Sequence, residues 1–76
     1  MSDHAAVSTV SRISVNGEVR ELEAGMSVAE LLAGLGRHPR TVALERNGVI
    51  VPRARFDSVV LADGDRLEII AFTQGG

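Results

Sequence analysis

The first clear pattern in the chain is an alternation of apolar and polar positions around an Asn-Gly pair. Ile13 and Val15 alternate with polar residues, Asn16-Gly17 follows, and the segment 18–22 runs back with a second alternation. Both central residues of a type I′ turn need positive φ, which asparagine and glycine tolerate best. The pattern therefore predicts a β-hairpin that begins at about Arg12.

A second stretch repeats this pattern 31 residues later. The segment 41–46 (TVALER) is followed by Asn47-Gly48 and then by the apolar run 49–51. Pro52 lacks an N–H group, so it limits further sheet pairing. We therefore expect a second hairpin that ends at this proline.

Between the hairpins, apolar residues no longer recur every second residue but every three or four residues, as in a helix. Ser27 and Glu30 have the spacing of a capping box, which satisfies free N–H groups at a helix start. Gly36 can adopt the left-handed conformation that ends helices, and Pro39 disfavours continuation. The apolar positions i, i+3, i+4 and i+7 share one face, which we expect to be core: Val28, Leu31, Leu32 and Leu35.

The last regular pattern is an apolar run over residues 66–72. Leu67, Ile69 and Ala71 fall on one face and Ile70 and Phe72 on the other, as in a central strand. The segment 59–61 before it reads as a short strand or a turn. Asp-Gly pairs favour turns, so Asp63-Gly64-Asp65 indicates a chain reversal. A calcium loop is not indicated, because its ligand spacing is absent.

Two hairpins, one helix and a last strand predict an α+β domain, a mixed sheet with the helix packed across one face. Ile70 and Phe72 would then lie on the open face, together with Ala43. Such exposed apolar patches often mark contacts with a partner, although a patch of two or three residues also occurs without one.

The chain closes on Gly75-Gly76 directly after this strand. Glycine has no Cβ, so such a segment can enter a narrow pocket and present its carboxylate to another protein. A frayed end or a cloning remnant would have the same sequence. We interpret residues 1–11 as a flexible extension, 12–72 as the domain and 73–76 as a flexible tail.

Composition narrows the possible chemistry. The 76 residues allow one core, and the absence of cysteine removes disulfides, thiolate nucleophiles and cysteine-ligated metals. His4 and His38 lack the spacing of a metal site, so we expect no metal. With a net charge of −2 and two aromatic residues, nucleic acid is not an expected partner. We find no membrane span or signal peptide and expect a cytoplasmic protein.

The order of these features resembles the β-grasp fold of ubiquitin-like proteins, and most closely the ThiS family of sulfur carriers in thiamine biosynthesis. The resemblance covers about residues 12–76. It rests on these stretches: Asn16-Gly17, the helix 27–35, residues 43–47, 51–53 and 61–65, residues 67–69, Phe72 and Gly75-Gly76.

The resemblance implies that Gly76 is the reacting residue and that the chain is not itself an enzyme. A ThiF-like adenylyltransferase would use ATP to adenylate its carboxylate, and persulfide sulfur would replace AMP to give a thiocarboxylate. A ThiG-like thiazole synthase would accept the sulfur. A carboxylate with a pKa of about 3.3–3.7 is ionised at neutral pH and resists nucleophiles, so it needs such activation. No permanently bound cofactor is implied.

The resemblance also implies two sets of contact residues. Residues 73–76 would span about 13–14 Å when extended and thread into the partner's active site, with Thr73, Gln74 and Gly75 ahead of Gly76. Partner contacts on the sheet would come from Ile70, Phe72, Ala43 and Arg53. For Arg53, a solvated charge after an edge proline is an equally good interpretation.

Two departures from the family pattern leave the pathway open: the extension of about eleven residues and Thr73-Gln74 before the glycines. Sulfur carriage to molybdopterin, a tRNA base or an amino acid is the nearest alternative. A ubiquitin-like modifier joined to lysines through Gly76, and an interaction module with an idle tail, are the others.

Overall fold

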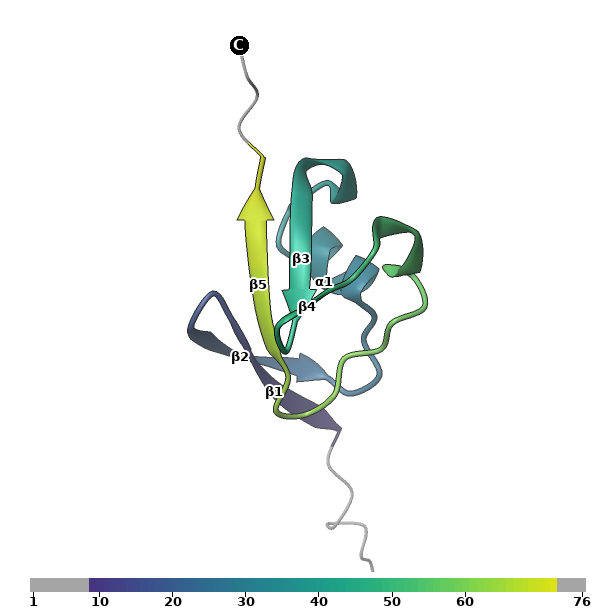
Figure 1. The fold of residues 1–76 in the computed structure, drawn as a ribbon. Helices are drawn as coiled ribbons and strands as arrows, with labels where there is room; N and C mark the ends of the chain where they lie inside the picture. Colours follow the sequence, from purple (N-terminus) through teal and green to yellow (C-terminus); the bar gives the residue numbers. More distant parts are fainter. Residues whose placement is uncertain (1–8, 73–76) are drawn as a thin grey trace, which may run out of the picture.

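The computed structural model describes residues 9–72, which form a five-stranded mixed sheet with one α-helix across one face (Figure 1). The strand order is β2-β1-β5-β3-β4, so the last strand of the chain lies in the centre. This confirms the predicted α+β layout. In chain order the elements are β1 (Val10–Val15), β2 (Glu18–Glu23), α1 (Val28–Gly34), a 3₁₀ helix (Pro39–Thr41), β3 (Val42–Arg46), β4 (Val49–Ile50), a 3₁₀ helix (Arg53–Arg55) and β5 (Arg66–Ala71).

Both predicted hairpins are present, and both turns have the positive φ angles that type I′ requires. The angles are 51° at Asn16 and 87° at Gly17 in the first turn, and 53° at Asn47 and 86° at Gly48 in the second. Val15 pairs with Glu18 and Arg46 with Val49, so each loop has two residues. The local sequence is therefore sufficient to set the register of each hairpin.

The two turn asparagines also hold the central strand from opposite sides. The Ile69 N–H donates to Asn16 Oδ1 at 2.8 Å, and Asn16 Nδ2 donates to the Ile69 carbonyl at 3.2 Å. The Arg66 N–H donates to Asn47 Oδ1 at 2.8 Å. Each side chain thus acts as an added backbone partner for β5, which the hairpin pattern alone does not reveal.

The core lies between the sheet and α1. β5 pairs parallel with β1 and antiparallel with β3, and all three strands turn alternate residues towards the helix. In Figure 1, α1 lies behind the sheet on this side. The buried apolar residues are Ile13, Val15, Val28, Leu31, Leu32, Val42, Leu44, Val51, Phe56, Leu61, Leu67 and Ile69. Ala71, predicted to face the same way as Leu67 and Ile69, is exposed at the last position of β5.

The helix begins and ends where the sequence predicts. Ser27 is the N-cap, its Oγ accepts from the Glu30 N–H at 3.1 Å, and Glu30 Oε1 accepts from the Ser27 N–H at 2.9 Å. Gly36 has φ of 72°. Val28, Leu31 and Leu32 are buried, while Leu35 packs at the edge of the core.

Replacing Ser27 with alanine should lower the free energy of unfolding by about 1 kcal/mol, because the Glu30 N–H loses its acceptor. Chemical denaturation monitored by circular dichroism measures this. Ser14→Ala, at a strand position where the structure shows no side-chain hydrogen bond, should change the value by less than about 0.5 kcal/mol. Equal losses in the two variants would contradict a capping role for Ser27.

Two strands begin at other residues than the sequence predicts. β1 begins at Val10, two residues before Arg12, because the Ala24 N–H donates to the Thr9 carbonyl at 2.8 Å and extends the hairpin. Ser11, placed in the predicted extension, is therefore buried in the sheet. β3 begins at Val42 because the three residues before it form a 3₁₀ helix. The rest of the predicted extension, residues 1–8, lies outside the described residues.

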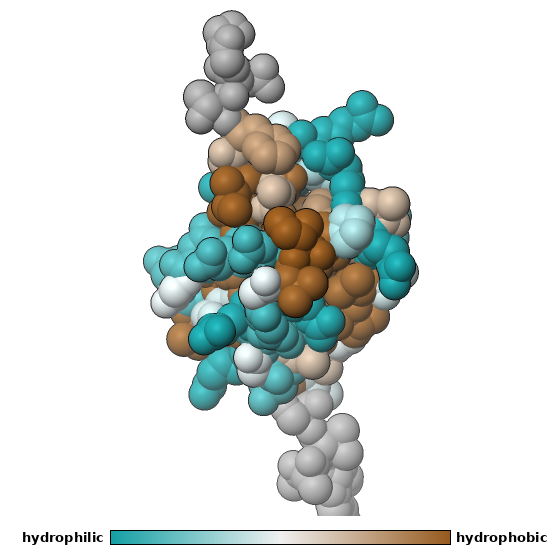
Figure 2. Space-filling view, viewed as in Figure 1, coloured by the Kyte–Doolittle hydropathy of each residue, from teal (hydrophilic) through white to brown (hydrophobic). Residues whose placement is uncertain are grey.

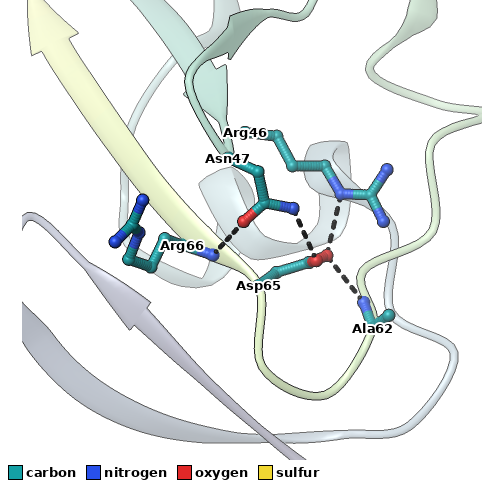
Figure 3. A network of polar contacts seen from close by, with 5 residues as sticks. All are labelled: Arg46, Asn47, Ala62, Asp65 and Arg66. Carbon is teal, nitrogen blue, oxygen red and sulfur yellow. Dashed lines mark hydrogen bonds and ion pairs between the residues drawn. The ribbon is translucent and has the colours of Figure 1, made fainter.

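The predicted reversal at residues 63–65 contains a buried carboxylate (Figure 3). Asp65 is 6% exposed. Its Oδ2 accepts from Arg46 Nε and from the Ala62 N–H, both at 2.8 Å, and its Oδ1 accepts from Asn47 Nδ2 at 3.0 Å. Burial acts to raise the pKa of Asp65, but the Ala62 N–H, Arg46 and Asn47 together outweigh it and lower the pKa. Asp65 therefore joins the reversal to the second hairpin.

Candidate partner-binding site

The candidate site is the open face of the sheet at the end of β5. The Phe72 N–H donates to the Thr41 carbonyl at 2.9 Å, so the chain is paired with the segment before β3 up to its last described residue. The predicted threading and reacting residues Thr73, Gln74, Gly75 and Gly76 lie outside the described residues. Their roles stay predictions.

Three of the predicted contact residues share this open face. Ala43 and Ile70 are direct cross-strand partners, so their side chains lie on the same side of the sheet. Phe72 follows Ile70 by two residues and points the same way. Ile70 is 48% exposed and Phe72 is 50% exposed. Apolar side chains gather on the face seen in Figure 2, from the upper end of β5 towards the β4 edge. These residues make a continuous apolar surface.

A shallow groove of about 180 Å³ runs into this surface and brings Phe72 next to Arg53. Its floor consists of core residues from β3 and the segment after β4. The lining residues are Val42, Ala43, Leu44, Ile50, Val51, Pro52, Arg53, Phe56 and Phe72. Three of the four predicted contact residues thus line one groove, and the fourth, Ile70, pairs with Ala43 beside it.

Arg53 is held on the rim of this groove. Its Nε donates to the Pro39 carbonyl at 3.0 Å, which joins the segment after β4 to the 3₁₀ helix before β3. Within residues 9–72, Arg53 forms no ion pair. The guanidinium therefore lies on the rim of the groove that Phe72 also lines, with its charge available to a partner.

The sequence interpretation missed Ile50 as part of this surface. It is 57% exposed and pairs with Glu45, which places it on the same face as Ala43. The two-residue turn at Asn47-Gly48 contains the signal, because it sets which residues of the hairpin face each other. Counting across that turn places Ile50 on the open face.

The geometry suits a protein contact. No group of three histidine, aspartate or glutamate residues is arranged for a metal ion in the described part of the chain. None of the helices within residues 9–72 has the length and apolar character that a membrane crossing needs. What the open face offers is an apolar groove with one arginine, next to the strand that leads to the C-terminal glycines.

Comparisons with known proteins give a consistent picture. Residues 13–76 match the model of the ThiS family. A protein of Paramagnetospirillum magneticum named thiazole synthase is 48% identical over 65 residues, which cover 86% of this chain and 20% of that protein. The chain therefore spans about a fifth of the length of this relative.

Smaller relatives match over nearly their full length. The sulfur carrier protein ThiS of Escherichia coli is 32% identical over 65 residues, which cover 86% of this chain and 98% of that protein. The crystal structure of the thiamine biosynthesis protein ThiS from Geobacter metallireducens superposes with a TM-score of 0.74 at 32% identity. That alignment covers 86% of this chain and 99% of the other. The similarity confirms the β-grasp fold.

Proposed function

Because the chain belongs to the ThiS family, whose members are small sulfur carriers and not enzymes, we propose that it carries sulfur for thiazole formation in thiamine biosynthesis. One observation carries the proposal. The family match begins in β1 and continues to Gly76, so it includes both the open face of the sheet and the C-terminal glycines. The working group is then the Gly76 carboxylate.

The chemistry follows from the inertness of that carboxylate at neutral pH. One carboxylate oxygen attacks the α-phosphorus of ATP on a ThiF-like adenylyltransferase, and pyrophosphate leaves. A persulfide sulfur then adds to the carbonyl carbon, and AMP leaves. A thiol reduces the resulting acyl disulfide and releases the thiocarboxylate. ATP is a substrate of the partner in this scheme, and the carrier contributes position and no catalytic side chain.

We propose a ThiG-like thiazole synthase as the acceptor. A stretch similar to this chain forms part of a relative that is itself named thiazole synthase. When two modules share one chain, their effective concentration reaches the millimolar range. Such a fusion would favour delivery of sulfur from the carrier module to the synthase module. The same pair of modules, as separate chains, would need a surface such as the open face to meet.

Intact-mass analysis tests the proposal directly. The chain is incubated with ATP, a persulfide donor, a thiol and the adenylyltransferase of the same organism. We expect the mass to rise by the difference between sulfur and oxygen, with fragmentation placing the change at Gly76. A ladder of much heavier conjugates would instead indicate a modifier, and an unchanged mass with an active enzyme would indicate an interaction module.

A second step tests the pathway. The isolated thiocarboxylate is mixed with thiazole synthase and the remaining substrates of thiazole formation. Loss of sulfur from the carrier with formation of product supports the thiamine route. A stable thiocarboxylate in the presence of an active synthase would contradict it and favour another acceptor.

A further inference from the structure

Two glutamates face each other on the open side of the sheet. Glu45 of β3 and Glu68 of β5 are direct cross-strand partners, two residues along each strand from Ala43 and Ile70. Two residues along a strand span about 7 Å. Like charges placed directly opposite each other destabilise a sheet. This arrangement therefore costs the domain some stability, which an added cation would recover.

The described residues form no direct ion pair with either carboxylate. Three ion pairs are present among them, Arg12 with Glu21, Arg20 with Glu18, and Arg46 with Asp65. Neither Glu45 nor Glu68 takes part in one of these pairs or in a side-chain hydrogen bond within residues 9–72. Arg66 lines the same hollow of about 420 Å³ as the two glutamates, but it forms no ion pair with them.

The hollow with the two glutamates also contains Arg66, two residues before Glu68 on β5, so two carboxylates and one guanidinium leave it a net charge of −1. The other end of the face has the opposite charge. Moving along β3 and β5, the glutamate pair comes first, then Ala43 with Ile70, and then Phe72 beside Arg53. The apolar groove thus lies between two carboxylates and one guanidinium that lacks a described ion-pair partner. The charge of the face thus changes from negative to positive in the direction in which β5 runs towards its C-terminal end.

We propose that this face binds thiazole synthase through a complementary charge pattern, with a lysine or arginine of the synthase over Glu45 and Glu68 and a carboxylate beside Arg53. The inference rests on the proposed function, because it takes the proposed sulfur acceptor, thiazole synthase, as the partner. A partner that covers the apolar groove also removes water from the flanking charges, and an unpaired buried charge is costly. A partner with opposite charges at both ends avoids that cost.

The pattern also defines orientation. The face is acidic at one end and basic at the other, so a partner bound the wrong way round would place like charges together. The bound synthase therefore meets the residues after Phe72 from one direction only. The charges select the partner and set its orientation, while the apolar groove supplies contact area.

The test compares the binding of three full-length variants to the thiazole synthase of the same organism by titration calorimetry. Glu45→Gln/Glu68→Gln should raise Kd about tenfold at low salt, and Arg53→Gln should also raise it. Glu23→Gln removes an exposed strand glutamate at the far edge of the sheet and should change Kd less than about twofold. High salt should shrink the difference between the double variant and the unaltered protein, because ions screen the charges.

Thermal unfolding separates this role from a structural one. Removing two facing like charges should leave the Tm of the double variant unchanged or raise it by a few degrees. Unchanged binding of the double variant would overturn the inference while leaving sulfur carriage intact. Failure of the unaltered protein to bind the synthase would instead overturn the proposed partner. Adenylyltransferase binding that depends on these charges, when synthase binding does not, would also overturn the inference.

Discussion

Deletion of Gly76 should abolish thiocarboxylate formation while the domain stays folded. The deletion moves the terminal carboxylate back by one residue, about 3.3–3.6 Å, which removes it from the reacting position in the adenylating site. Gly75→Ala should lower the rate about 100-fold, since a Cβ next to the reacting group displaces it and small displacements of reacting groups have effects of this size. Intact-mass analysis over a time course measures both rates.

Gly34→Ala is the matched control for these variants. Gly34 lies at the end of α1, outside the positive φ region, and a Cβ built there meets no atom within 4 Å. The substitution should leave the rate of thiocarboxylate formation unchanged. Sulfur incorporation into the Gly76 deletion variant at the normal rate would contradict the assignment of the terminal carboxylate as the reacting group.

Replacing Asp65 with alanine should have the largest effect on stability, a loss of about 3 kcal/mol. Three donors, from Arg46, Asn47 and Ala62, would lose their acceptor in a buried place. A domain of this length has about 4–11 kcal/mol of stability in total, so the variant should unfold at much lower denaturant concentration. Asp57→Asn, an exposed aspartate without a described hydrogen bond, should unfold like the unaltered protein.

The same carboxylate predicts a dependence on acid. The pKa of Asp65 is lowered in the folded state, so folding favours the ionised form. Its contribution is fully present above the unfolded pKa of about 3.9 and is lost as the pH falls through the folded pKa. Unfolding free energies measured from pH 6 downwards should therefore fall more steeply below about pH 4 for the unaltered protein than for Asp65→Ala. Equal slopes would contradict this role for Asp65.

Short-range patterns account for what could be predicted about the fold. The Asn-Gly pairs require positive φ, so they specify two-residue turns and the register of each hairpin. Ser27 and Glu30 satisfy each other's N–H groups, so they specify where the helix starts. The alternation in residues 66–72 indicates a strand with two apolar faces, which is correct for the central β5. Each of these signals depends on residues within one turn or one strand.

The candidate site was predictable in part for the same reason. Ile70 and Phe72 stand out in the apolar run 66–72, the alternation pattern places Ala43 on the same face, and the family resemblance adds Arg53. Their assembly into one groove depends on the pairing of β3 with β5 and on the Arg53 bond to Pro39. These contacts join residues 14 to 29 positions apart in sequence, so no local pattern reports them.

The amino-acid sequence by itself thus determines the hairpins, the helix and the outward position of two apolar side chains. Turn preferences, helix capping and apolar–polar alternation all act over a few residues. The folded arrangement adds the clamps of Asn16 and Asn47 on β5, the burial of Asp65, and the facing carboxylates of Glu45 and Glu68. These features arise only when distant strands come together, since burial and cross-strand pairing are properties of the whole sheet. The charge pattern proposed to orient the acceptor belongs to this second group.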